Sequence, residues 1–124
     1  MIPQYWKAFV NDNALEYREI EIPEDVDLTG AGAEIEILDE EGIRQETEDL
    51  YSGIAVSKDG FVPVGSCQIG TGDPYFIYQN DGPKGPLYRI YHDMVGEDGY
   101  EREEATDIVL PDYTEILNYI ITGS

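Results

Sequence analysis

A succession of short apolar runs, each closed by a turn rich in glycine, aspartate or proline, most constrains how this chain can fold. Between residues 53 and 93 the runs are GIAV, FVPVG, SCQIG, YFIYQ and PLYRIYHD, and the turns include SKDG, TGDP and NDGPKG. Runs of this length between turn residues are typical of strands joined by hairpins. This part of the chain therefore predicts a meander of antiparallel strands.

Apolar residues repeat at helical spacing near both ends of the chain. At the N-terminus they are Ile2, Tyr5, Trp6, Phe9 and Val10. At the C-terminus, after Pro111, they are Tyr113, Ile116, Leu117, Ile120 and Ile121, with Gly123 where a cap belongs. Between the ends, LEYREIEIP and AEIEIL predict two strands, and Asp39 is expected to cap a polar helix that runs to Leu50.

We therefore expect an α+β fold, with a single twisted, largely antiparallel or mixed sheet and amphipathic helices at both termini. The length of 124 residues predicts one domain, residues 1–124. No apolar run approaches the roughly 20 residues that span a bilayer, and the N-terminus does not have the pattern of a signal peptide. The chain's one cysteine, Cys67, excludes an internal disulfide and predicts a core or near-core thiol in a reducing cytoplasm.

Acidic residues dominate the charge, with 27 aspartates and glutamates against 7 basic residues and a formal net charge of -20. Such a chain repels a phosphate backbone and an anionic membrane, so neither nucleic acid nor membrane is expected as a partner. The charge favours either attraction of a basic protein or adaptation to a salty cytoplasm. The candidate contact residues lie in two acidic clusters and are Glu34, Glu36, Glu40 and Glu41, then Glu97, Asp98 and Glu101.

The stretch IGTGDPYFI contains the most distinctive turn. Gly70 and Gly72 can adopt positive φ without steric cost, and Asp73 can accept hydrogen bonds from backbone N–H groups. A phosphate-binding loop normally adds a lysine and a following helix, whereas this turn carries an aspartate and is followed by the strand-like YFIY. The pattern therefore favours a turn that shapes the fold.

His92 and Asp93 are the strongest candidates for chemistry. His92 and Cys67 could act as base and nucleophile, but they fall on different predicted strands. Zinc requires three or four ligands, and the oxygen-rich NDN and GEDG segments do not match a calcium-binding loop. We expect no catalytic residue, metal or cofactor. The alternative is a small enzyme that uses His92, Asp93 or Asp73.

Ten tyrosines give the chain a high aromatic content. Those on the strands around the glycine turn are Tyr75, Tyr78, Tyr88 and Tyr91. They predict either cross-strand pairs within the sheet or a protein-binding face, because tyrosine is enriched at interface hot spots.

The N-terminal helix with Trp6, followed by GFVPVG, IGTGDPYFI, GPLYRIYHD and the C-terminal YTEILNYI, resembles the SUKH superfamily, the family of a fungal cell-wall regulator. The resemblance covers essentially the whole chain and is most specific from Phe61 to Asp93. It implies an α+β domain with a mixed, strongly bent sheet and no catalytic residues. By the resemblance, the fold-shaping turn comprises Gly65, Gly70, Gly72, Asp73 and Tyr75.

Many bacterial members of that superfamily are immunity proteins that bind and neutralise toxin domains, often nucleases or deaminases. The resemblance thus implies a non-enzymatic protein that neutralises a toxin domain of a polymorphic or contact-dependent system. The single cysteine and the acidic charge add the expectation that the protein is cytoplasmic and that the toxin is basic. A regulatory scaffold without a toxin partner is the alternative. The resemblance names no interface, and the sequence leaves the oligomeric state open.

Overall fold

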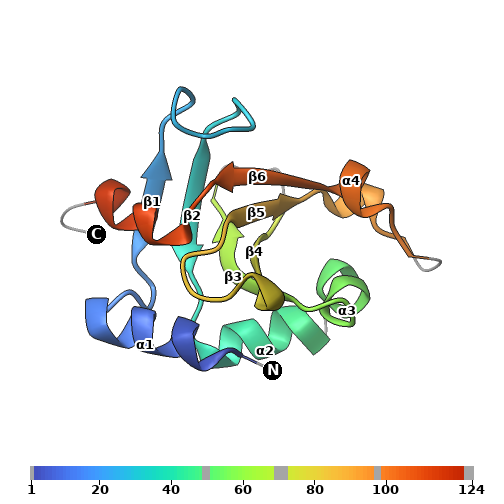
Figure 1. Ribbon diagram of the computed structural model, residues 1–124, viewed down its shortest axis with the longest axis horizontal. Coiled ribbons are helices and arrows are strands. Elements are labelled where there is room, and N and C mark those ends of the chain that lie inside the picture. Colours follow the sequence, from blue (N-terminus) through green and yellow to red (C-terminus); the bar gives the residue numbers. More distant parts are fainter. Residues whose placement is uncertain (1, 49–50, 69–72, 97–98, 122–124) are drawn as a thin grey trace.

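The computed structural model describes residues 2–48, 51–68, 73–96 and 99–121. Its helical segments are α1 (Gln4–Asn13), α2 (Glu40–Glu48), α3 (Tyr51–Ser57) and α4 (Arg102–Ala105), with the 3₁₀ segments η1 (Gln79–Asp81), η2 (His92–Met94) and η3 (Tyr113–Tyr119). Its strands are β1 (Glu19–Ile22), β2 (Ala33–Ile37), β3 (Phe61–Cys67), β4 (Tyr75–Tyr78), β5 (Leu87–Ile90) and β6 (Thr106–Leu110). The predicted α+β class and the N-terminal helix are confirmed (Figure 1).

The strands form one six-stranded sheet in the order β1-β2-β3-β4-β5-β6, and each neighbouring pair is antiparallel. The sheet is therefore antiparallel rather than mixed, and it curls strongly (Figure 1). The segment after β6 returns to the free edge of β1, where Ile20 and Ile120 form an isolated antiparallel bridge. The Ile121 N–H also donates to the Glu19 carbonyl at 2.9 Å. The chain thus covers an edge that would otherwise be open to another strand.

The inner face of the curl encloses the larger hydrophobic cluster. All six strands contribute to it, with Ile20, Ile35 and Tyr75 among its members, and α1 adds Trp6. The ring of Tyr113 lies edge-on to Trp6, with centroids 5.2 Å apart, so η3 packs directly against α1. This contact explains why apolar residues recur near both ends of the sequence.

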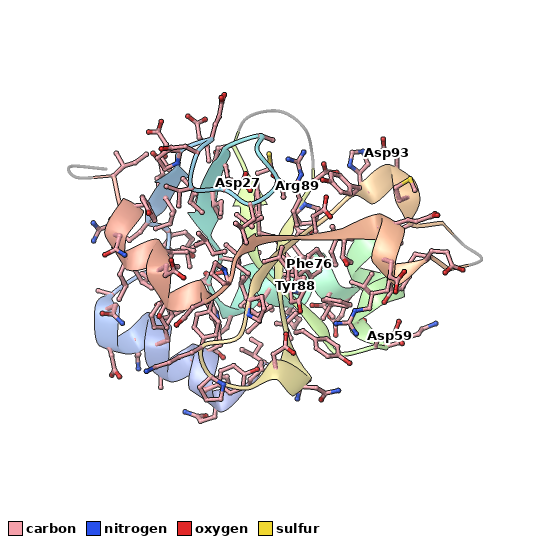
Figure 2. All side chains as sticks on the ribbon, turned by 45° about the horizontal axis from the view of Figure 1, so that its top comes forward. Asp27, Asp59, Phe76, Tyr88, Arg89 and Asp93 are labelled. Atoms are coloured by element: carbon pink, nitrogen blue, oxygen red, sulfur yellow. The ribbon has the colours of Figure 1, made fainter. Side chains whose placement is uncertain are left out.

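On the outer face of the sheet, α3 and α4 pack over β3, β4 and β5. A second cluster forms there from Val56 of α3, Ala105 of α4 and strand residues that include Phe61, Phe76 and Tyr88. Phe76 and Tyr88 lie together at the centre of the molecule, whereas Asp93 lies at the periphery (Figure 2).

A bulge in β3 explains the need for Gly65. The β3–β4 register shifts between Pro63 and Gly65. A Cβ at Gly65 would lie 2.3 Å from Ile35 Cγ2, on the inner face where Val64 is also buried. Two successive residues therefore face inward, and the second has no room for a side chain. Gly65 thus lies within β3 and not in the predicted turn, and Gly70 and Gly72 lie outside the described residues.

Three of the local predictions are wrong. GIAV, predicted as a strand, lies in α3, because periodicity alone does not separate a short buried helix from a strand. Strand β6 was not predicted from the sequence. Its burial does not alternate as in a half-buried strand, because Asp107 and Ile108 are exposed while Val109 and Leu110 are buried. The C-terminal helix is the 3₁₀ segment η3, and Gly123 lies outside the described residues.

Candidate functional site

Asp73 is a buried carboxylate that lies just before β4. Its side chain is 7% exposed, and its Oδ2 accepts from Arg89 Nη2 at 2.9 Å and from Arg89 Nε at 3.3 Å. Its Oδ1 accepts from the His92 backbone N–H at 2.9 Å and lies 2.6 Å from His92 Nδ1. Asp73 therefore ties the entry of β4 to β5 and to the residues that follow β5.

The electrostatics of Asp73 agree with an anchoring role. Burial by itself would raise the pKa of the Asp73 carboxyl, but the His92 N–H, the Arg89 guanidinium and the His92 ring together lower that pKa. Burial is the largest single effect on Arg89 and opposes its charge, but the hydrogen bond to Asp73 and the neighbouring acidic groups together raise the pKa of Arg89. The two charges thus stabilise one another in a site that water hardly reaches.

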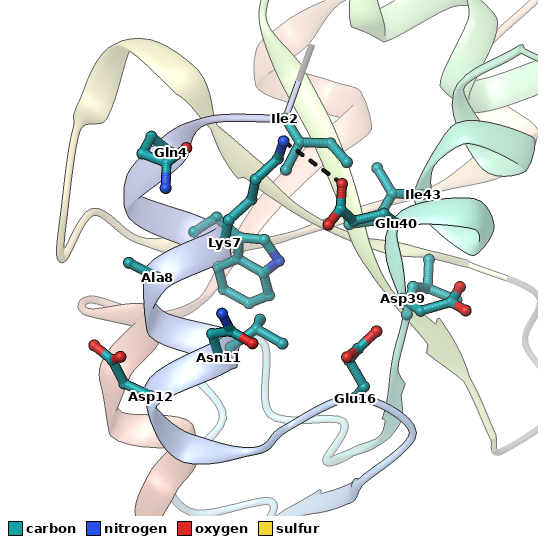
Figure 3. A pocket seen from close by; sticks show the side chains of 13 residues that line it. Ile2, Gln4, Lys7, Ala8, Asn11, Asp12, Glu16, Asp39, Glu40 and Ile43 are labelled. Carbon is teal, nitrogen blue, oxygen red and sulfur yellow. Dashed lines mark ion pairs between the residues drawn. The ribbon is translucent and has the colours of Figure 1, made fainter.

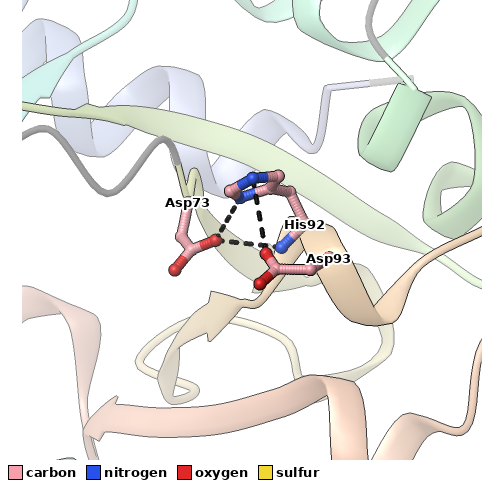
Figure 4. Close-up of side chains that lie close together, drawn as sticks. All are labelled: Asp73, His92 and Asp93. Carbon is pink, nitrogen blue, oxygen red and sulfur yellow. Dashed lines mark hydrogen bonds and ion pairs between the residues drawn. The ribbon is translucent and has the colours of Figure 1, made fainter.

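His92 joins Asp73 to the exposed Asp93 (Figure 4). The His92 ring is half exposed, and its Nε2 lies 3.3 Å from Asp93 Oδ1. One ligand atom from each of these three side chains falls within 4.8 Å of the others, which is compact enough for a metal ion. However, an ion on Asp73 would compete with the buried guanidinium of Arg89, because the hydrogen bonds already occupy both carboxylate oxygens. The geometry favours a structural use of Asp73.

The four candidate tyrosines do not form one exposed face, which was the second of the two alternatives predicted from the sequence. Tyr75 is fully buried in the inner cluster, and Tyr88 is 8% exposed in the outer one. The Tyr88 hydroxyl donates to Asp81 at 2.9 Å, which satisfies it inside the structure. Tyr78 and Tyr91 are partly exposed, but Arg102 lies over the ring of Tyr78 at 4.3 Å. Neighbouring strand residues point to opposite faces, so Tyr75 packs in the inner cluster, whereas Tyr78 and Tyr88 pack in the outer one.

The outer face of β1 and β2 carries glutamates instead of an apolar cluster. Glu19 lies directly opposite Glu36, and Glu21 lies opposite Glu34. We call these four residues the glutamate ladder. Glu21 is exposed and the other three are partly exposed. Across the described residues, none of the four forms an ion pair with a basic side chain.

The remaining acidic candidates lie elsewhere. Glu40 and Glu41 are exposed in the first turn of α2, where Lys7 pairs with Glu40 and Arg44 pairs with Glu41. Glu101 is exposed just before α4, at the other end of the molecule from β1 (Figure 1). Glu97 and Asp98 lie outside the described residues. The structure therefore brings Glu34 and Glu36 together and places Glu101 far from them.

No family model matches the chain, and neither a curated protein nor a solved structure matches it. No helix in the described ranges is long and apolar enough to cross a membrane.

The sequence prediction missed Glu19 and Glu21 as members of the acidic face. The signal was present, because EIEI occurs in both predicted strands and places each glutamate on the face opposite the isoleucines. It also missed Arg89 as the partner of Asp73. These two residues are far apart in sequence, and only the β4–β5 pairing brings them together.

Proposed function

We propose that this chain is a non-enzymatic protein-binding domain that captures and neutralises a basic toxin domain in the cytoplasm. The glutamate ladder is the observation that carries the proposal. Like charges directly opposite one another on a sheet are destabilising, by about 0.2–1 kcal/mol for each pair. The ladder has two such pairs, Glu19–Glu36 and Glu21–Glu34. A basic partner would convert this repulsion into attraction on binding.

The net charge and the family resemblance support the same class of partner. A field of one sign attracts an oppositely charged protein and raises association rates by roughly 10- to 1000-fold. The formal net charge of -20 has the sign that a nuclease or another nucleic-acid-binding toxin would meet favourably. The SUKH resemblance supports toxin neutralisation independently of the charge, because it rests on sequence motifs.

The first test starts from the neighbouring genes, because the proposal predicts that the gene directly upstream encodes a secreted protein with a toxin domain at its C-terminus. That toxin domain is then co-purified with this chain. A stable complex is expected. If no such domain binds and the chain instead binds a cytoplasmic regulator, the chain is a regulatory scaffold and toxin neutralisation is wrong.

The second test measures association rates with that toxin domain as salt rises. The ladder variant changes Glu21, Glu34 and Glu36 to Gln, and the control variant makes the same change at Glu101, Glu103 and Glu104. The on-rate of the parent should fall steeply with salt, because the Debye length shrinks to about 8 Å at physiological strength. The ladder variant should associate about tenfold more slowly at low salt, with a flatter slope. Equal slopes for all three proteins would remove the ladder from the mechanism.

A further inference from the structure

Two adjoining hollows lie between α1 and α2. The first, of about 320 Å³, is bordered by α1 and by the start of α2, and the second, of about 450 Å³, continues along α2 to β3. Both are lined by Ile2, Glu40 and Ile43, so they form one continuous depression, which we call the α1–α2 groove. Figure 3 shows Lys7 of α1 and Glu40 of α2 reaching toward one another across it.

The floor of the groove is apolar. Trp6 and Ile43 are almost completely buried in its wall, at 1% and 3% exposure, and the partly exposed Ile2 extends the apolar surface. The indole N–H of Trp6 has no acceptor within the part of the chain that the structure describes. The groove thus offers a place for apolar side chains, together with one open hydrogen-bond donor beside it.

The rim of the groove is acidic. The carboxylates that line it are Asp12, Glu16, Asp39, Glu40, Glu41 and Glu48. The cations that line it, Lys7 and Arg44, already form ion pairs with rim glutamates. An apolar floor inside an acidic rim is complementary to a segment that is apolar on one side and cationic on the other.

We propose that the α1–α2 groove binds a cationic amphipathic helix of a protein partner. An extended peptide normally binds along a free strand edge, whereas the groove is bordered by α1, α2 and β3, and β3 is already paired with β2 and β4. A helix needs no backbone ladder, because it presents apolar anchors at i, i+3, i+4 and i+7. The proposal deepens the proposed function and rests on it, since the helix would belong to the basic toxin domain.

The groove and the glutamate ladder adjoin. Tyr17 donates a hydrogen bond to Asp39 on the groove rim. This bond raises the pKa of Tyr17, followed by burial and the charge of Asp39, and the carboxylates of Glu16 and Glu36 add smaller contributions. Glu16 belongs to the groove and Glu36 to the ladder, so the two acidic surfaces meet beside Tyr17. A partner helix in the groove would place its neighbouring basic residues over the ladder.

Trp6 provides a direct readout, because it is the one tryptophan of the chain and lines the groove. The probe is a synthetic leucine-lysine peptide of about 14 residues, or about four helical turns, with leucines at i, i+3, i+4 and i+7. Titration should change Trp6 fluorescence, and a peptide of the same composition in scrambled order should not. Absence of a fluorescence change, or equal responses to the two peptides, would overturn the proposal.

Matched variants locate the binding surface. The groove variant, Asp12→Asn with Glu16→Gln and Glu48→Gln, removes three rim charges and should weaken the ordered peptide about tenfold. The control variant (Glu101, Glu103 and Glu104 to Gln) should change affinity less than about twofold, because these exposed residues do not line the groove and salt screens their charges. Equal losses in the two variants would mean that the peptide responds to net charge alone, which contradicts the groove.

Binding measurements with the toxin domain distinguish a failure of this inference from a failure of the proposed function. If it binds tightly, leaves Trp6 fluorescence unchanged and is indifferent to the groove variant, the groove is wrong while toxin binding stands. If the ordered peptide binds in the groove but the toxin domain does not bind at all, the proposed function fails and the groove remains a site for another cationic helix.

Discussion

Replacing Asp73 with alanine should be among the most damaging single substitutions in this protein. The change removes the carboxylate that accepts from both Arg89 and His92. It also leaves the Arg89 guanidinium, whose side chain is 9% exposed, without its ion-pair partner. An isolated carboxylate hydrogen bond contributes about 1–3 kcal/mol, but breaking a buried ion pair from one side costs about 3–5 kcal/mol. We expect the larger value, because a charge is stranded in the interior.

The measurement is urea unfolding at pH 7 followed by circular dichroism, with Asp73→Ala, Arg89→Met and the double variant compared with the parent. The midpoint should fall with little change in the m value. The double variant should be more stable than the sum of the two single losses predicts, since it removes both charges together. A loss below about 1 kcal/mol for Asp73→Ala, or strictly additive losses, would refute the anchoring role of the pair.

The pH dependence follows from the direction of the pKa shift. The pKa of Asp73 is lower in the folded protein than its ordinary value, so the folded state favours the ionised carboxylate. This contribution is complete above the unfolded pKa of about 3.9 and is lost as pH falls through the folded pKa. The stability gap between the parent and Asp73→Ala should therefore narrow below about pH 4. A gap that stays constant down to pH 2 would contradict this assignment.

Three further predictions follow from single contacts. Gly65→Ala should destabilise the fold by about 1–3 kcal/mol in urea unfolding, because the new Cβ meets Ile35 Cγ2; an unchanged midpoint would show that β3 adapts freely. Glu36→Gln should stabilise the protein by about 0.2–1 kcal/mol at low salt, because it relieves the repulsion from Glu19, and this gain should disappear near 1 M salt. A loss of stability at low salt would contradict the prediction. His92→Ala should remain able to bind and neutralise the toxin domain once its folding is confirmed; a folded variant that binds but no longer protects would favour the enzyme hypothesis.

The alternation of residues in the sequence determined the strands whose two faces differ in chemistry. Residues 33–38 were predicted as a strand because isoleucine and glutamate alternate, and β2 (Ala33–Ile37) has that burial pattern. The capping role of Asp39 was also predictable, because a cap is a local interaction; the Gly42 N–H donates to Asp39 Oδ1 at 2.7 Å. Trp6 and its helix followed from the spacing of apolar residues, which is likewise a property of neighbouring turns.

Tertiary structure decided which faces were covered and which distant residues met. The tyrosines could not be assigned to core or surface from sequence, because their burial depends on where α3 and α4 pack. These helices pack over one part of the outer face, and the glutamates of β1 and β2 on the other part remain in contact with water. GIAV is helical because Val56 packs in the outer cluster. Strand β6 forms because it pairs with β5 and buries its last residues in the core. The Asp73–Arg89 pair likewise required the β4–β5 register. Sequence patterns report forces between residues a few positions apart, whereas burial and ion pairing depend on elements that only the folded chain brings together.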